Sequence, residues 1–396
     1  MKIPNILEVI YAPLKALKKI AEHPTIVAPI LVIIIYIVAN MGYFYVSASK
    51  VSLEQTVPVG LLENEWTQNS TLWTSNAQIS QSDDFVNGTT YLSSQYYGNS
   101  SLVFSTNNNS QLSMELQGIG TVNCSNPNGY NKLSFRLKWT SPSIGPTNVS
   151  IRLFSANSSD NFYRSLTSDF AGSTVETWNN ETILLASSEW SSSSTTADWG
   201  SITGLRMEFV WPESANVTVL LDGLFFHGLF ISGFDLYGSG YLLNAALSSV
   251  MQFTLTWVIL SGLIYLLAKF LGGTLVWRMA LIATGVILIT LFVLAILNAV
   301  GAALVSDLKY PFELAAGFKG EAAADAAYNK IVDQLFVPDL IWRYGLVAIH
   351  IWTTFLCAVV VRVLAGFTWT KSVLVGAMAY VINIIIGSLL FGIPIF

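Results

Sequence analysis

Residues 26–46 of this chain are IVAPILVIIIYIVANMGYFYV, an apolar run without a single charged side chain. Because about 20 apolar residues cross the hydrocarbon core of a bilayer, this run predicts a membrane span. It is too long for the apolar region of a secretory signal peptide and has no clear small-residue cleavage site. We therefore interpret it as a retained signal anchor.

Four more apolar runs follow toward the C-terminus, at 241–268, 276–305, 340–361 and 372–393. The composition agrees with them, since 53% of the 396 residues are hydrophobic and only 11% are charged. Soluble domains carry about 25% charged residues. The net charge of −5 argues against a nucleic-acid partner. We predict a five-helix transmembrane bundle in contact with the lipid bilayer.

A polar block separates the first span from the second. Residues 48–225 hold 7 Lys and Arg against 15 Asp and Glu, whereas the rest of the chain holds 12 against 9. Polar and apolar residues alternate in this block over four short runs: 133–139, 149–154, 205–211 and 217–221. Clusters of Asn, Gly, Ser and Pro separate the runs, which favours an antiparallel sandwich. The predicted fold is a multi-domain membrane protein: the five-helix bundle plus an all-β extracellular sandwich at 48–228, inserted between spans 1 and 2.

The distribution of Lys and Arg near the span ends predicts the orientation. One set of ends carries eight basic residues: Lys2, Lys15, Lys18, Lys19, Lys269, Arg278, Arg362 and Lys371. The loop 306–339 at the other set holds three lysines and six acidic residues. We predict a plasma-membrane protein whose N-terminus is cytoplasmic, with 48–240, 306–339 and the C-terminus outside. Within the loop, 321–335 predicts a surface helix that ends before Pro338.

The N-terminal segment 1–23 predicts a cytoplasmic amphipathic helix, followed by span 1 at 24–47. Apolar residues of 3–22 form one stripe, and its Lys and Glu residues lie opposite. Two interpretations stay open: the helix lies among the lipid head groups, or it packs on the cytoplasmic ends of the spans. Pro13 would kink it.

Four pieces of the polar block resemble the jelly-roll modules of the carbohydrate-binding and galactose-binding-like kind. They are 98–104, 130–137, 198–205 and the closing strand 217–226, which contains Leu221-Asp-Gly-Leu-Phe-Phe226. The resemblance implies a jelly roll, contact with glycans, and a structural calcium ion held by Asp222 with Glu63 or Glu65. Calcium takes six to eight oxygen ligands, and these residues supply only part of that set. The alternative is that Asp222 caps a strand exit together with Gly223.

Tryptophan is frequent in the polar block. The seven tryptophans of the block are Trp66, Trp73, Trp139, Trp178, Trp190, Trp199 and Trp211. Tryptophan rings stack on sugars in some proteins, but they more often fill the core of a β-sandwich. We expect at most two of the seven to form a sugar platform.

Nine glycosylation sequons all lie within the polar block. They are Asn69, Asn87, Asn99, Asn108, Asn123, Asn148, Asn157, Asn180 and Asn216. Their confinement to the block supports its external placement as a glycoprotein surface. Sequons, acidity and few lysines fit an archaeal cell surface, and a eukaryotic lumen is the alternative. Cys124 and Cys357 lie in different parts of the chain, so we expect no disulfide between them.

The flanks of the block, 1–47 and 240–396, resemble the Yip-domain family of five-span membrane proteins. The resemblance is carried by the entry segment 11–24, by 266–273 at the end of the second span, and by the last two spans joined through 369–372. It implies the five-span fold. For eukaryotic members it implies vesicle traffic with small GTPases, and for prokaryotic relatives it implies no particular activity.

The sequence contains no recognisable catalytic motif. The three histidines (23, 227 and 350) are scattered, and neither a Gly-rich phosphate loop nor a Gly-x-Ser-x-Gly elbow occurs. Four polar residues are predicted to lie at membrane depth: Asn244, Asn298, His350 and Asn383. They would line a conduction or substrate path, or join helices by hydrogen bonds. Small residues recur at i, i+4, i+8 from Ala295 and from Ala379, which favours close helix contacts within the chain or with a membrane-protein partner.

These observations predict a non-catalytic cell-surface protein without a required cofactor. Its sandwich would be a scaffold, or an adhesion module that contacts glycans or a cell-envelope protein. An accessory subunit of a larger membrane complex is the alternative. A transporter or channel is less favoured, because acidic residues are nearly absent from the spans.

Overall fold

The computed structural model describes residues 3–59, 65–85, 98–156, 159–316 and 321–391. The chain divides into two compact units. The helical unit comprises Met1–Ser52, Ser232–Leu308 and Val332–Phe396, and the β unit comprises Leu53–Ile231 and Lys309–Ile331.

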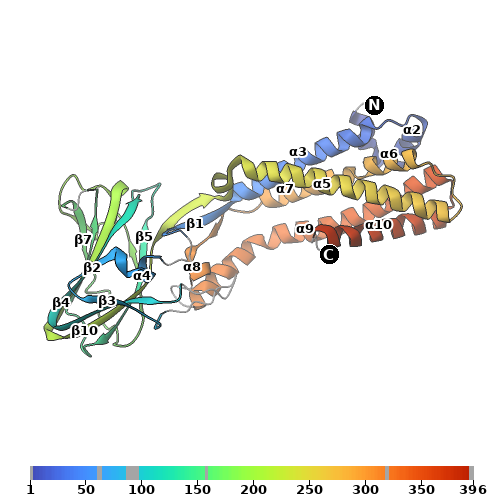
Figure 1. Ribbon diagram of the computed structural model, residues 1–396. Coiled ribbons are helices and arrows are strands. Elements are labelled where there is room, and N and C mark those ends of the chain that lie inside the picture. Colours follow the sequence, from blue (N-terminus) through green and yellow to red (C-terminus); the bar gives the residue numbers. More distant parts are fainter. Residues whose placement is uncertain (1–2, 60–64, 86–97, 157–158, 317–320, 392–396) are drawn as a thin grey trace. The chain divides into compact units, whose positions relative to one another are not determined.

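The β unit is built from antiparallel strands (Figure 1). In chain order they are β1 (Val51–Val57), β2 (Trp73–Ser75), β3 (Gln78–Ser82), β4 (Ser101–Val122), β5 (Lys132–Ser141), β6 (Asn148–Phe154), β7 (Asn161–Ser165), β8 (Asn179–Leu184), β9 (Ser191–Ser192), β10 (Ile202–Ser232) and β11 (Leu308–Tyr310). Short helices α4 (Glu65–Gln68) and α8 (Phe312–Ala316) and two 3-10 turns, Ser70–Leu72 and Trp199–Ser201, accompany the strands.

Two long strands, β4 and β10, run through both layers of a sandwich. The later half of β4 and the earlier half of β10 form the first layer with β2, β6, β7 and β9. Their remaining halves form the second layer with β3, β5 and β8. The two runs predicted as separate strands, 205–211 and 217–221, are thus parts of one strand. A register shift between Val210 and Val217 replaces the expected turn, so the strand bends from one layer into the other.

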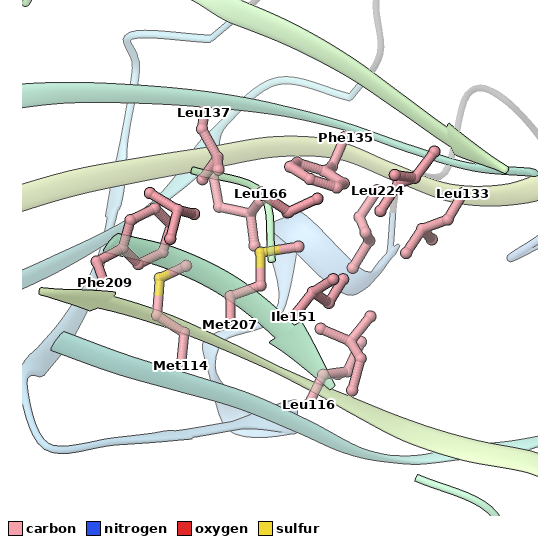
Figure 2. Close-up of a cluster of buried hydrophobic side chains, with 14 of the residues drawn as sticks. Met114, Leu116, Leu133, Phe135, Leu137, Ile151, Leu166, Met207, Phe209 and Leu224 are labelled. Carbon is pink, nitrogen blue, oxygen red and sulfur yellow. The ribbon is translucent and has the colours of Figure 1, made fainter. Parts of the chain in front are cut away.

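The core of the β unit lies between the two layers. Figure 2 shows Met114, Met207 and Ile151 from the first layer facing Phe135 and Leu137 from the second. All five side chains are at most 1% exposed. The alternation seen in the sequence accounts for this core, because every second residue of a strand points to the same face.

The helical unit contains the longer helices of the chain. They are α3 (Val27–Lys50), α5 (Gly233–Phe270), α6 (Trp277–Ile287), α7 (Ile289–Ala303), α9 (Glu321–Ala365) and α10 (Trp369–Phe391). Of α9, the part from Val332 onward belongs to this unit. Five stretches of helix are long and apolar enough to cross a membrane, as predicted. They are Val27–Lys50, Gly233–Phe270, Trp277–Ala303, Ala322–Ala365 and Trp369–Leu390.

The predicted end of a surface helix before Pro338 is wrong. Helix α9 continues through Pro338 to Ala365, so the segment after residue 321 and the fourth span are one helix. An interior proline removes its own amide from the hydrogen-bond ladder, and its ring crowds the carbonyl four residues earlier, at a cost of about 3 kcal/mol. The long apolar helix on the C-terminal side of Pro338 therefore outweighs this local disruption, and the helix continues.

The predicted single amphipathic helix over 3–22 is two helices, α1 (Ile3–Tyr11) and α2 (Pro13–Glu22). Pro13 starts the second helix, where its missing amide costs nothing. Ile6, Leu17 and Ile20 are at most 2% exposed within the core of the helical unit. Packing on the spans is thus observed for these three residues, whereas Leu7 and Leu14 of the same stripe are 38% and 40% exposed, so the head-group interpretation stays open.

Candidate functional site

One outward row of side chains crosses the first layer of the sandwich. In register, Glu115 of β4 lies opposite Arg206 of β10, Arg206 lies opposite Arg152 of β6, and Arg152 lies opposite Tyr163 of β7. Their neighbours along each strand point into the core. We call Glu115, Arg206, Arg152, Tyr163 and the adjacent Glu208 the polar row.

Ion pairs and ring contacts link the members of the polar row. Arg206 binds Glu115 through two guanidinium nitrogens and lies 3.7 Å from Glu208. Arg152 approaches Glu208 at 3.8 Å, and its guanidinium lies 5.5 Å from the ring centroid of Tyr163. The two arginine side chains are 38% and 39% exposed. The polar row therefore presents charged donors and acceptors to solvent.

Arg152 is the least satisfied member of the polar row. Its Nε atom is buried and has no hydrogen-bond partner among the described residues. A buried guanidinium N–H without an acceptor costs free energy, of the order of 1–3 kcal/mol. Because Nε itself is buried, a ligand would meet Arg152 through the rest of its 39% exposed side chain.

The tryptophans lie mostly elsewhere. Trp66, Trp73, Trp139 and Trp211 are at most 5% exposed and belong to the core. The other three, Trp178, Trp190 and Trp199, are half-buried. Trp199 stacks on Phe162 at 3.9 Å between ring centroids, and Trp190 meets Trp199 edge-on at 5.4 Å.

Sequence reasoning thus missed Tyr163, the aromatic residue of the polar row. The available signal was a charged residue at some outward positions, such as Arg152 in Ser150-Ile-Arg-Leu153. The pairing of β4, β10, β6 and β7 is needed to bring these residues together.

A second cluster in the β unit has the order of a serine–histidine–acid triad. Ser134 Oγ lies 2.8 Å from His227 Nε2, and His227 Nδ1 lies 2.7 Å from Glu54 Oε1. Triads of this kind activate serine in hydrolases. Here Ser134 has no exposed surface and also lies 2.8 Å from the hydroxyl of Thr182. A substrate therefore has no route to Ser134 Oγ in this conformation, and the cluster acts as a buried hydrogen-bond chain.

Glu54 anchors that chain. Burial alone would raise the pKa of Glu54. The hydrogen bonds from His227 and from the backbone amide of Phe312, with the charges of His227 and Lys132, hold this pKa below its ordinary value. Glu54 is thus kept ionised at the place where β1, β10 and α8 meet.

The calcium candidates are only partly within the described residues. Asp222 is fully buried, lies opposite Arg136 in register, and accepts a hydrogen bond from Thr67 at 3.4 Å. Strand β10 continues nine residues beyond Gly223, so Asp222 does not cap a strand exit. Glu65 is exposed in α4, and Glu63 lies outside the described residues. The described residues contain no cluster of three or more His, Cys, Asp or Glu side chains suited to a metal ion. Calcium binding stays a prediction.

Six of the seven sequons that the structure describes have an exposed asparagine. Asn69 is half-buried and accepts hydrogen bonds from Thr71. The exposed members are Asn99, Asn108, Asn123, Asn148, Asn180 and Asn216. Asn87 and Asn157 lie outside the described residues. Cys124 and Cys357 are both free and buried.

Polar side chains in the helical unit mostly join helices to one another. His350 Nδ1 lies 2.9 Å from the Tyr380 hydroxyl, and Asn40 donates to Ser249 at 2.7 Å. Asn383 is 6% exposed and Ala379 is fully buried, so this part of the small-residue face is used within the chain. Asn244 is exposed. Of the four residues predicted at membrane depth, His350 is the one with a hydrogen bond between helices among the described residues.

Comparison with known proteins gives no family for this chain. No protein-family model and no curated protein matches it. The Yip-domain resemblance therefore stays a prediction.

Three similar solved structures contain carbohydrate-active proteins. One is the family 11 carbohydrate-binding module from Clostridium thermocellum in complex with a β-1,3-1,4-mixed-linked tetrasaccharide, at 14% identity over 44% of this chain and 95% of that chain, with a TM-score of 0.27. A structure of carbohydrate-binding modules from the β-sandwich superfamily matches at 11% identity over 41% of this chain and 58% of that chain, with a TM-score of 0.25. An exo-β-agarase matches at 13% identity over 42% of this chain and 24% of that chain, with a TM-score of 0.28. At these scores the likeness assigns neither family nor ligand.

Proposed function

We propose that the chain is a multi-pass plasma-membrane protein that holds its β-sandwich outside the cell and contacts glycans through the polar row, without catalysing a reaction. The 39% exposed side chain of Arg152, with its guanidinium beside the ring of Tyr163, is the observation that carries this proposal.

The chemistry of the polar row suits a carbohydrate. Sugar hydroxyls both donate and accept hydrogen bonds, so they pair with guanidinium donors and carboxylate acceptors together. Arg152 and Arg206 supply the donors, and Glu115 and Glu208 supply the acceptors. The apolar face of a sugar ring would pack on Tyr163, as aromatic rings commonly pack on apolar surfaces.

The same geometry supports a binding role without catalysis. Glu115 and Glu208 lie beside Arg206 and form ion pairs with it, so their oxygens are placed to accept hydrogen bonds and to hold charge. The serine–histidine–acid chain is buried in the β unit and is engaged with Thr182. Neither cluster presents an accessible nucleophile beside a base.

The test uses the full chain in detergent micelles and an array of soluble oligosaccharides, followed by titration of the best binders. We expect weak binding, with a Kd between about 10 µM and 1 mM, because few groups contribute. Arg152→Ala and Tyr163→Ala should each weaken binding about tenfold, which is the effect of losing one charge-assisted hydrogen bond or one aromatic contact.

Trp178→Ala is the matched control, because it removes a half-buried aromatic ring that precedes β8 and lies outside the polar row. It should leave glycan binding unchanged. A folded chain that binds no oligosaccharide, or that binds equally well after Arg152→Ala, would refute the glycan assignment and favour a protein partner for the sandwich.

A further inference from the structure

The helical unit contains a groove at one end of its spans, between α3, α7 and α9. Its cavity volume is about 420 Å³. This size falls in the range of roughly 300–1,000 Å³ typical of small-molecule sites. The groove is lined mainly by apolar residues, among them Val305, Leu335, Ile341 and Trp342. Its lining suits a hydrocarbon chain.

Small residues and a proline create the space. Gly301 and Ala302 form the α7 side of the groove, and a Cβ atom at Gly301 would lie 3.5 Å from Ile341 of α9. Pro338 lies opposite on α9 and has no amide to give the carbonyl of Gln334. Larger side chains at 301 or 302 would fill the groove.

One polar atom in the groove lacks a partner. The Oδ1 atom of Asn298 is buried and accepts no hydrogen bond among the described residues, although Asn298 lines the groove. A buried amide oxygen without a hydrogen bond costs free energy. A turn of the Asn298 amide toward the groove would bring this oxygen to a ligand hydroxyl, which would satisfy it.

Charges around the groove balance. Lys50 lies 3.3 Å from Asp307, and Arg343 lies 2.8 Å from Asp339. Lys50 and Asp339 line the groove. Two basic and two acidic groups favour neither an anionic nor a cationic head group, so a neutral head group fits best.

We propose that this groove binds one neutral membrane lipid, with an apolar chain between α3, α7 and α9 and a head-group hydroxyl that donates to Asn298 Oδ1. The groove lies between apolar helices at the end of three predicted spans. Membrane lipid surrounds such helices, so lipid is the expected occupant. This site is separate from the polar row and does not depend on glycan binding.

The test compares two neutral probes that share one chain. Monoolein carries free hydroxyls, whereas methyl oleate carries none. The full chain is purified in detergent and stripped of lipid, and each probe is titrated by native mass spectrometry and by the melting temperature. We expect one monoolein per chain, a saturable rise in melting temperature, and binding of methyl oleate weaker by about tenfold, because it cannot satisfy Asn298.

Three variants locate the site. Gly301→Leu and Ala302→Leu should each abolish monoolein binding by filling the groove, and two positions are used so that a folding defect in one leaves the other informative. Asn298→Leu should reduce monoolein binding to the level of methyl oleate. Asn383→Leu, at a buried position of α10 outside the groove, should bind monoolein as the unmodified chain does.

Two results would overturn the proposal. The first is an unmodified chain whose melting temperature and mass do not respond to monoolein. The second is monoolein binding that survives both groove-filling variants or that equals methyl oleate binding before any substitution.

Discussion

Glu54 of β1 and His227 of β10 lie 2.7 Å apart, Oε1 to Nδ1, and both side chains are at most 7% exposed. They are separated by 173 positions in the sequence. This contact, together with the amide of Phe312, ties the first strand of the β unit to its longest strand and to α8.

The lowered pKa of Glu54 gives the β unit a dependence on acid. Because this pKa lies below the ordinary value of 4.5, the folded state binds fewer protons than the unfolded state in that range. The resulting stability is present above pH 4.5 and is lost as the pH falls through the folded-state pKa. Glu54→Gln should lower the melting temperature at pH 7 and flatten the acid limb of its pH profile. An unchanged acid limb would show that another group controls it.

Phe312 should contribute stability to the β unit although it follows the third span in sequence. Its side chain is 4% exposed and packs on Phe225 and on the ring of His227, at 5.3 Å and 4.7 Å between centroids. Phe312→Ala should cost about 3–5 kcal/mol, as buried Phe→Ala changes do. Thermal unfolding of the full chain measures this loss.

The matched control for that loss is Phe336→Ala, which removes a 62% exposed ring from α9. Its melting temperature should stay within error of the unmodified chain.

A fragment covering 50–228 lacks Phe312, so it should fold as a β protein but melt below a fragment to which 309–331 is joined. Equal melting temperatures would contradict the role given to this segment.

Glu181 of β8 produces the opposite dependence on pH. Burial, and next the nearby charge of Asp169, raise the pKa of Glu181 to about 7, although Arg164 opposes the shift. The folded state therefore binds more protons, and its stability falls as the pH rises from about 4.5 to about 7. Glu181→Gln should remove this decline, which melting curves between pH 5 and pH 8 will show. The exposed Glu213→Gln should retain the decline.

Local patterns in the sequence were enough to predict the elements with strong periodicity. Alternation over 133–139 predicted β5, whose Leu133, Phe135 and Leu137 are fully buried, and uninterrupted apolar runs predicted the five candidate spans. These features depend on neighbours within a few residues. They are therefore visible before any fold is known.

The clusters that carry chemistry could not be predicted in the same way. Arg152 and Tyr163 meet only through the register of β6 with β7, and His227 meets Ser134 across 93 positions. The continuity of α9 through Pro338 depends on packing in the helical unit, which overrides the local preference of proline to end a helix. Long-range pairing and tertiary packing leave no short-range signature.

The predicted orientation can be tested with single cysteines, since Cys124 and Cys357 are both buried and should give little background. Ser306→Cys and Thr274→Cys place thiols at exposed positions on the two predicted sides of the membrane. A membrane-impermeant maleimide added to intact cells should label the first variant and not the second. Labelling of Thr274→Cys in intact cells would reverse the predicted topology, whereas its labelling only after permeabilisation would support it.

Gly376 should be the residue of α10 least tolerant of a side chain. A Cβ atom there would lie 2.5 Å from the backbone nitrogen of Ala358 in α9, so the two helices touch through their backbones at this point. Backbone atoms cannot move aside as a flexible side chain can, and overpacking of this kind costs typically about 1–3 kcal/mol. Gly376→Ala should therefore lower the melting temperature of the full chain in detergent. Gly387→Ala on the same helix meets nothing within 4 Å and should leave it unchanged or raise it slightly, because alanine favours helix. Equal melting temperatures for the two variants would show that α9 and α10 do not approach so closely at Gly376.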